Sequence, residues 1–440
     1  MMTNQSLKLE LLKSELRRFL IFFLDELKPK GKIITPFNVI AAVIISVGVV
    51  LIIIRFIFGL GSITNLNQDF PWGLWIGFDV VTGVAFAGGA YVMTFMVYIL
   101  RMEKFHPIIR ITVLNGFLAY IFYAGALLLD LGRPWHVINP IIGNSFGVSS
   151  VMFLVAWHFM LYMFAEFIEF SPAIAEWFGW KKLRKFLGTL TLATVIFGIT
   201  LSTLHQSGLG ALFLMAKNKI HPLWYSEFIP ILFFVSSIFA GLSMVILEGS
   251  ISHKVFKQRM NSTIKFSHNK IVIGLAKICA GTMFVYLFLK VLVFVHEKNW
   301  AYLNTPWGYW FLVEIVIFVM FPLILYSNAV KYKNSSVAKI ASVFTLTGIL
   351  LNRLNTSLIA YNWQVTERYI PTWMEIEVTL MVVVVEILVL RWIVNRLPIL
   401  SDPPIWAGEE RRTPYRKIFL IKKKETVKQE ELEEWKISCM

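Results

Sequence analysis

Ionisable side chains that lie inside long apolar runs are the residues of this sequence that could do chemistry. Asp79 follows Pro71 by eight residues in one such run, and His205 lies in the polar segment STLHQSGLG (202–210) near the end of another. An imidazole with a pKa near ~6.5 passes protons at working pH, and a buried carboxyl group does so when its pKa is raised. Such a pair suits a quinone head, which has two hydrogen-bond-accepting carbonyls and takes up a proton with each reduction step. A polar pocket in lipid could equally serve an ion or a transported solute.

Other ionisable residues also fall inside apolar runs, where a charge costs at least about 2.5–3.5 kcal/mol. They are functional candidates, unless Asp79 or Glu314 pairs with Arg353 or Lys290 as a structural lock. The candidates nearer the predicted outer end are Asp79, Glu314, Glu375, Glu377, Lys290 and Arg353, and the deeper ones are His158, Glu166, Glu169, Glu248, Lys277 and Glu386.

The cysteines and histidines limit the redox cofactors that the chain can bind. Cys279 and Cys439 lie far apart and cannot form a cysteine-ligated iron–sulphur site or a CxxCH haem attachment. A transmembrane b-type haem needs two axial histidines at matching depth, and His158 has no partner at its depth. His205 and His296 could form one outer pair, so a single haem stays open. We predict no metal site, and we expect His106, His253 and His268, in the connections of the predicted inner end, to be solvated.

Composition indicates an integral membrane protein. The 440 residues are 57% hydrophobic and 16% charged, with a mean hydropathy of +0.66, whereas a soluble domain is about a quarter charged. The net charge of +15 could indicate a nucleic-acid partner. Its distribution follows membrane topology instead, so we predict no nucleic-acid binding. We see no cleavable signal peptide, because charged residues run throughout the segment before the first apolar run.

A membrane-spanning helix needs about 20 mostly apolar residues. The sequence therefore predicts an all-α, polytopic membrane bundle of about ten transmembrane helices, which could form two four-helix bundles with flanking helices. The predicted spans are 37–60, 73–99, 108–129, 148–170, 187–212, 226–249, 271–296, 307–329, 337–359 and 373–396.

Basic residues gather at alternate connections between these spans. The N-terminal arm, the even-numbered connections and the C-terminal tail hold most of the lysines and arginines, whereas 61–71 has none. By the positive-inside rule, both termini lie in the cytoplasm and the protein lies in the cytoplasmic membrane. We call the side of the even-numbered connections the predicted inner end and the opposite side the predicted outer end.

Three regions follow from this topology. Residues 1–36 form a cytoplasmic arm, in which 5–27 reads as an amphipathic helix on the inner membrane surface. Residues 37–396 form the transmembrane domain, with the candidate quinone-site bundle at about 71–212. Residues 397–440 form a charged cytoplasmic tail, which is either helical near its end or simply solvated.

Two spans open with the same motif at the predicted outer end. PWGLW (71–75) leads to Asp79, and PWGYW (306–310) leads to Glu314, each eight residues after its proline. At 1.5 Å per residue, each acid lies about 10 Å deeper than its proline. Two related half-bundles would explain this echo, and so would a shared interfacial start with tryptophans in the aromatic belt.

Five sequence segments resemble the NrfD/PsrC-type membrane subunits of respiratory oxidoreductases. The resemblance is strongest to the ten-span branch that includes the hydrogenase-2 membrane subunit HybB and the sulphite-reduction-associated subunit DsrP. STLHQSGLG followed closely by HPLWY is the most specific part. The matching segments are PWGLWIGFDVVTGVAFAGGAYV (71–92), LDLGRPWHVINP (129–140), STLHQSGLGALFL (202–214), HPLWYSEFIPILFF (221–234) and GLSMVILEG (241–249).

The resemblance implies a haem-free, quinone-reactive subunit that works within a complex rather than as a stand-alone enzyme. It implies menaquinone as the bound substrate and no haem or iron–sulphur cluster in this chain. It also implies an extracytoplasmic ferredoxin-like iron–sulphur subunit and a catalytic subunit as partners. The predicted outer connections, short and nearly free of lysine and arginine, are where we expect docking. The predicted docking residues are Asp130, Arg133, His136, His221 and Glu227.

The same resemblance places the quinone site near the predicted outer end of spans two and five. The chain departs from the ten-span pattern at Leu154, where relatives have a glutamate that His158 could replace one turn later. The predicted quinone-binding residues are Asp79, His205, Gln206, Trp75 and Tyr91, and the predicted proton route comprises His158, Glu169, Glu248 and Glu386.

Two other classes of function stay open. One is a diheme-like cytochrome b anchor, which the absorption spectrum of the purified subunit would reveal. The other is a secondary transporter, which the PWG echo would favour if it reflects a true internal repeat.

Overall fold

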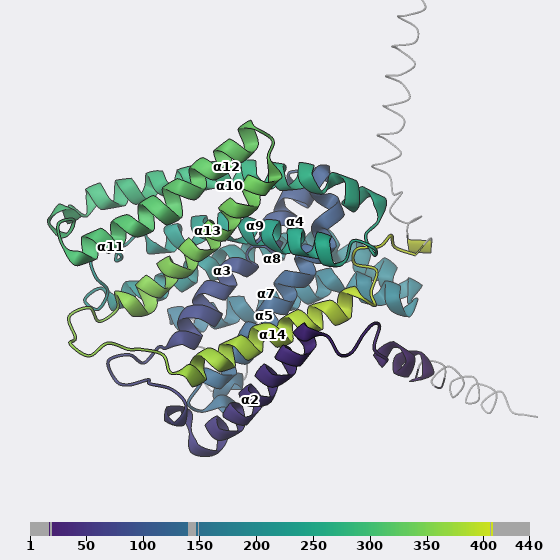
Figure 1. Ribbon diagram of the computed structural model, residues 1–440, viewed down its shortest axis with the longest axis horizontal. Coiled ribbons are helices and arrows are strands. Elements are labelled where there is room, and N and C mark those ends of the chain that lie inside the picture. Colours follow the sequence, from purple (N-terminus) through teal and green to yellow (C-terminus); the bar gives the residue numbers. More distant parts are fainter. Residues whose placement is uncertain (1–16, 18–19, 140–146, 148, 405, 408–440) are drawn as a thin grey trace, which may run out of the picture.

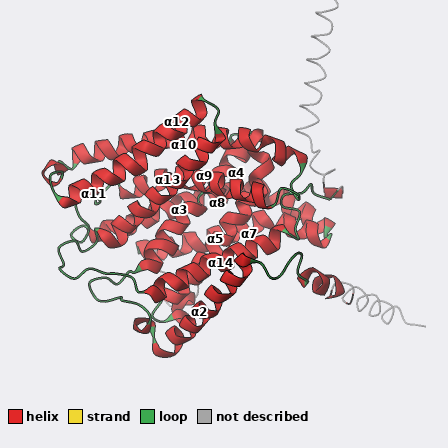
Figure 2. Ribbon diagram, viewed as in Figure 1, coloured by secondary structure: helices red, strands yellow, loops and turns green. Residues whose placement is uncertain are grey.

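The computed structural model describes residue 17 and residues 20–139, 147, 149–404 and 406–407. This part of the chain is a bundle of long helices joined by loops (Figures 1 and 2). Among the described residues, nine helices are long and apolar enough to cross a membrane. The prediction of an all-α, polytopic membrane protein is therefore confirmed.

Several of the spans are built from consecutive α-helical, 3-10 and π-helical segments. The first half contains α2 (Pro36–Phe58), η2 (Trp75–Thr82), α3 (Gly83–Ala87), α4 (Gly89–Thr94), η3 (Phe95–Ile99), α5 (Ile109–Asp130), α7 (Val151–Phe178) and α8 (Lys181–Leu212). The second half contains α9 (Ile229–Val255), α10 (Ser262–His296), α11 (Pro306–Ile315), η8 (Val316–Met320), α12 (Phe321–Lys331), α13 (Ser335–Leu354), η9 (Asn355–Ile359) and α14 (Trp373–Val394).

The tenth predicted span is the helix α14, which packs beside α2 (Figure 1). It is not among the nine candidate spans, because Glu375, Glu377 and Glu386 interrupt its apolar run. Its first turn is closed by a capping box, in which Thr372 and Glu375 exchange side-chain and backbone hydrogen bonds. Glu375, one of the acids that lower the hydropathy of this run, therefore also caps the start of the helix.

The helices at the predicted inner end are longer than the apolar runs alone suggest. α7 and α8 continue to a two-residue turn at Gly179 and Trp180, so most of the predicted connection between spans four and five is helical. Of the predicted arm helix 5–27, residues 20–27 are helical. The rest of that prediction, except residue 17, and the predicted tail helix lie outside the described residues.

Connections that are far apart in sequence meet at the predicted outer end. Ile220 and Tyr361 form an isolated β-bridge, and Asn299 Nδ2 donates to the carbonyl of Pro222 at 3.0 Å. These contacts join three connections that the predicted topology places on the same side.

The two halves of the chain share one buried core. α9 crosses α4 so closely that a Cβ atom on Gly241 would lie 2.1 Å from the backbone nitrogen of Gly89. Only the absence of a side chain allows this approach. The crossing fixes α9, from the second half, against the helices that hold Asp79 and Tyr91.

We expect Gly241→Ala to lower the free energy of unfolding by about 1–3 kcal/mol, because the added methyl group meets backbone that cannot move aside. Thermal unfolding of the purified protein in detergent measures this change. Gly249→Ala on the same helix is the matched control, since nothing lies within 4 Å of its Cβ position. Equal stability of the two variants would show that the crossing is not tightly packed.

Candidate functional site

Asp79 lies in a π-helical segment, η2, that begins at Trp75. Its side chain is 1% exposed, and neither carboxylate oxygen has a hydrogen-bond partner among the described residues. Single π turns inside membrane helices are frequent at functional sites, because they turn a side chain away from the regular helical register. Thr379 of α14 lies close enough to interact with Asp79, but its Oγ1 completes no hydrogen bond either. Asp79 is therefore a buried acid whose carboxylate has no completed hydrogen bond among the described residues.

The alternative in which Asp79 pairs with Arg353 is not formed. Arg353 Nη2 donates to Ser236 Oγ at 2.7 Å and Nη1 donates to Asn352 Oδ1 at 2.9 Å. Its guanidinium carbon also lies 3.6 Å from the centroid of the Phe233 ring. α13 packs on α9, and this contact turns the arginine toward the second half of the bundle.

Glu314, the second acid of the PWG echo, is instead fully satisfied by neutral donors. Its carboxylate accepts hydrogen bonds from Trp224 Nε1 at 2.7 Å, Asn352 Nδ2 at 2.7 Å and Asn355 Nδ2 at 2.5 Å. Lys290 lies within electrostatic range. Glu314 thus joins α11, α13, η9 and the loop before α9. The role is structural, but it rests on neutral donors rather than on the ion pair with Arg353 or Lys290 that the sequence left open.

His205 is held in a defined orientation on α8. Its Nδ1 lies 3.1 Å from the carbonyl oxygen of Val155, so Nδ1 carries the proton and donates. Its Nε2 is buried and has no partner among the described residues. In the neutral ring this leaves Nε2 as a free hydrogen-bond acceptor that faces the interior of the bundle.

His205 also lies closer to the depth of His158 than the sequence predicted. Val155, which accepts the bond from His205, is one helical turn from His158 on α7. The reason is the short turn between α7 and α8, which aligns the two helices further along their length. The alternative pair of His205 with His296 is not formed, because the exposed His296 lies at the end of α10 with its ring against Phe228.

Two tyrosines of α5 lie between His205 and Asp79. The Tyr120 ring centroid is 5.9 Å from that of His205, and Tyr123 lies within electrostatic range of Asp79. Tyr123 packs against the backbone one turn after Asp79, since a Cβ on Gly83 would lie 2.4 Å from its ring. The site between spans two and five thus includes residues of span three.

Sequence reasoning missed these tyrosines, although a signal was present. Tyr120 and Tyr123 are three residues apart, which places them on one face of a helix. A third hydroxyl, Ser202 Oγ, lies near Tyr120. Neither Tyr120 Oη nor Ser202 Oγ completes a hydrogen bond among the described residues.

The other predicted quinone-binding residues are engaged with neighbouring helices. Gln206 Nε2 donates to the carbonyl of Val84 at 2.8 Å and ties α8 to α3. Trp75 Nε1 donates to the carbonyl of Glu375 at 3.1 Å, and Tyr91 Oη lies 2.9 Å from Ser237 Oγ. These three side chains position the helices around Asp79 and His205.

The four predicted proton-route residues fall into two groups. Glu248 and Glu386 lie within electrostatic range of each other, and Tyr123 lies within range of both. Asn115 Nδ2 donates to Glu248. His158 and Glu169 belong to α7, on the other side of α5.

On α7, the nearest companion of Glu169 is a second buried acid. Glu166 is 2% exposed and accepts a hydrogen bond from Tyr162 Oη at 2.6 Å. One oxygen of Glu166 and one of Glu169 have no partner among the described residues.

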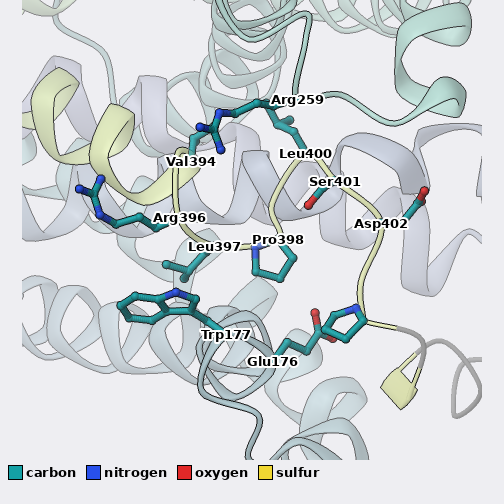
Figure 3. Close-up of a pocket in the computed structure, with 11 residues that line it drawn as sticks. Glu176, Trp177, Arg259, Val394, Arg396, Leu397, Pro398, Leu400, Ser401 and Asp402 are labelled. Atoms are coloured by element: carbon teal, nitrogen blue, oxygen red, sulfur yellow. The ribbon is translucent and has the colours of Figure 1, made fainter. Parts of the chain in front are cut away.

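The larger of the two described cavities lies away from all of these residues, at the predicted inner end. It has a volume of about 540 Å³ and is lined by Trp177, Arg259 and residues 396–398 and 400–402 (Figure 3). Glu176 at its wall already accepts hydrogen bonds from Arg110 and Arg184. This cavity is therefore not the predicted quinone site.

The predicted docking residues divide by exposure. Arg133, His136 and Glu227 are exposed at the predicted outer end, and Asp130 is half-buried within electrostatic range of Arg55. Part of the predicted docking connection, 140–146 and 148, lies outside the described residues.

The prediction of His221 as a docking residue is corrected by its burial. His221 is 1% exposed, and its ring packs against Trp224, Tyr302, Trp307 and Trp363 with centroids 4.7–5.6 Å apart. The β-bridge beside it pulls the loop onto the second half of the bundle. Burial lowers the pKa of His221 to about 4.

This pKa predicts a pH-dependent stability. Between about pH 6.5 and pH 4 the unfolded chain binds a proton at His221 while the folded imidazole stays neutral, so stability falls as the pH falls through this window. The loss is at most about 3 kcal/mol, and thermal unfolding at several pH values measures it. His221→Gln should flatten this dependence, whereas the exposed control His136→Gln should keep it. An unchanged slope in His221→Gln would contradict the assignment.

The sequence matches the family Polysulphide reductase, NrfD, over residues 62–366. A protein of Nitratidesulfovibrio vulgaris is 42% identical over 374 residues, which cover 84% of this chain and 96% of that protein. The probable Ni/Fe-hydrogenase 2 b-type cytochrome subunit of Escherichia coli is 31% identical over 387 residues, covering 87% of this chain and 96% of the relative.

A third relative carries a name that bears on the substrate. The menaquinone reductase, integral membrane subunit, of Nitratidesulfovibrio vulgaris is 28% identical over 384 residues, covering 78% of this chain and 86% of that subunit. The residues that match the family include the second to the ninth predicted membrane span, and the relatives align over most of their own length. The chain therefore belongs to the NrfD family, as a multi-pass membrane protein related to the membrane subunits of respiratory oxidoreductases.

Proposed function

We propose that this chain is the quinone-reactive membrane subunit of a respiratory oxidoreductase complex. It exchanges electrons between an iron–sulphur partner, docked at the predicted outer end, and menaquinone in the bilayer. Both termini lie in the cytoplasm, and a separate catalytic subunit completes the complex. A relative named as the integral membrane subunit of a menaquinone reductase supports the choice of substrate.

The observation that carries the proposal is a group of buried polar atoms on η2, α5 and α8 that complete no hydrogen bond. His205 Nε2, Tyr120 Oη, Ser202 Oγ and both carboxylate oxygens of Asp79 lack hydrogen-bond partners among the described residues. Leaving such groups unpaired in an apolar bundle is costly, so a ligand with polar atoms is expected to meet them. A quinone head brings two carbonyl oxygens on a flat apolar ring.

The chemistry assigned to these residues is proton exchange. Reduction of a quinone to a quinol consumes two electrons, which the docked cluster supplies, and two protons. The bond from Nδ1 to Val155 keeps His205 oriented while its Nε2 takes up or releases one proton. Asp79 exchanges the other, with Tyr123 beside it.

Protons reach Asp79 from the deeper acids in this proposal. Tyr123 lies within electrostatic range of Glu248, Glu386 and Asp79. Glu386 in turn lies within range of both Glu248 and Asp79. The predicted route therefore keeps Glu248 and Glu386 on this path, whereas His158 and Glu169 belong to the separate group on α7. Each acid can hold or pass a proton because, within the part of the chain that the structure describes, no salt bridge ties it to a cation.

His205→Ala and Asp79→Asn should leave complex assembly intact and lower quinone-coupled turnover by about 10²-fold, the usual scale for losing a positioned proton-transfer group. Turnover of the purified complex with a water-soluble menaquinone analogue measures this effect. The exposed residues His296 and Asp25 supply matched controls, His296→Ala and Asp25→Asn, which should keep wild-type rates. Near-wild-type turnover in both assembled site variants would remove this site from consideration.

A haem-binding function is the second candidate, because one relative is named a b-type cytochrome subunit. His205 and His158 on the packed helices α7 and α8 are the residues that this alternative would use. The purified wild-type subunit and the His205→Ala variant separate the two functions. We expect no stoichiometric b-type absorbance in either, and a b-type spectrum that disappears in the variant would replace the quinone proposal.

The docking proposal is tested at the exposed side chains of the predicted outer end. Trp135 is 69% exposed there. A photo-crosslinking residue in place of Trp135 or Glu227 should capture a ferredoxin-like subunit from intact cells. The matched position Trp180, exposed at the predicted inner end, should not. Capture from Trp180 alone would contradict both the topology and the docking surface.

A further inference from the structure

His253 and His268 form a stacked pair at the predicted inner end. His253 lies on α9 and His268 on α10, two helices that pack against each other (Figure 1). Their ring centroids are 4.3 Å apart and the planes are 15° from parallel. His253 Nδ1 and His268 Nε2 are buried without a hydrogen-bond partner among the described residues. The expectation that both imidazoles are simply solvated is therefore wrong.

A small cavity connects His268, one member of this pair, to one of the proton-route acids. Its volume is about 30 Å³, and its polar wall is formed by His268, Ser252, Thr112, Asn115 and Glu248. Its other walls are mainly apolar side chains of α5, α9 and α10. A water needs roughly 10–15 Å³ of such space and at least two polar partners, so the cavity has room for about two waters.

Residue positions along α9 show which side of this cavity is nearer the solution. Glu248 lies one helical turn deeper than Ser252, about 6 Å at 1.5 Å per residue. Lys257 and Lys265 are exposed and lie within electrostatic range of His253, as does Lys339 of α13. Charged lysine heads lie at the water-facing level of a membrane protein. The histidines thus stand between that level and Glu248.

We propose that His253 and His268, together with this cavity, form a proton-exchange site that connects Glu248 to the solution at the predicted inner end. The inference rests on the proposed function, in which Glu248 and Glu386 hold protons for Asp79. In each transfer one imidazole nitrogen accepts a proton from solution and the other nitrogen releases one into the cavity. The proton then reaches the Glu248 carboxylate, and no electrons move.

Time-resolved infrared spectroscopy of the full chain in lipid nanodiscs after a pH jump tests this site without quinone or an electron donor. The carboxyl band of Glu248, identified by its absence in Glu248→Gln, should follow the jump rapidly in the wild type. His268→Phe should slow its response by about 10²-fold. His296→Phe, at the opposite end of the same helix, is the matched control and should respond as the wild type does.

An unchanged rate in His268→Phe, or no Glu248 response at any pH from mildly acidic to mildly alkaline, overturns the proposal. Loss of quinone turnover with a normal Glu248 response would instead leave this site in place and count against the proposed function alone. If His268→Phe fails to fold, His268→Asn decides, because asparagine is smaller than histidine, stays polar and carries no titratable nitrogen. The Glu248 band of this variant should respond about 10²-fold more slowly than in the wild type, and a wild-type rate in it also overturns the proposal.

Discussion

A carboxylate inside an apolar bundle needs hydrogen-bond donors, a cation or a proton, and most of the structure is arranged around where this need is met. Glu314 receives three neutral donors from two helices and a loop. Asp79 occupies the equivalent position of the echoed motif and receives none among the described residues. The same sequence motif therefore starts two different spans. In one of them Glu314 joins neighbouring segments through hydrogen bonds, and in the other Asp79 stays available to exchange a proton.

The helix α5 explains how the free acid communicates with the rest of the bundle. It is packed between η2, α3, α7 and α14, and Asn115, Tyr120, Tyr123 and Asp130 mark four depths along it. Asn115 and Asp130 are fifteen residues apart, about 22 Å along the helix axis. Polar side chains at these depths can join groups near opposite faces of the membrane without placing a charge in contact with lipid.

Close contacts between neighbouring helices hold these polar side chains of α5 in place. α9 meets α4 at Gly241 and Gly89, and Gln206 fastens α8 to α3. The first contact presses the second half of the chain against the first, and the second contact joins two helices of the first half. The larger cavity at the predicted inner end is separate from these contacts, because its arginines and acids already pair with one another or with backbone carbonyls.

The sequence by itself determined the class of the protein and the approximate positions of its long helices. Twenty-residue apolar runs admit one solution in lipid, since every backbone group must be satisfied within its own segment. It also located Asp79, His205, Glu248 and Glu386, because a charge or an imidazole is conspicuous in such runs. Helix ends were less certain, as α7 and α8 show, because hydropathy marks where the apolar run ends, whereas a helix can continue through polar residues beyond that point.

Tertiary structure alone decided which of these groups are satisfied and which are not. Hydropathy cannot show that Arg353 turns toward Ser236 rather than Asp79, or that His221 is enclosed by aromatic rings. Hydropathy could not show the stack of His253 on His268 either. The spacing of the tyrosines of α5 placed them on one helix face but did not show which neighbours they meet. A hydrogen bond depends on the rotation and depth of two helices relative to each other, and these are set by side-chain packing across the whole bundle rather than by the composition of either helix.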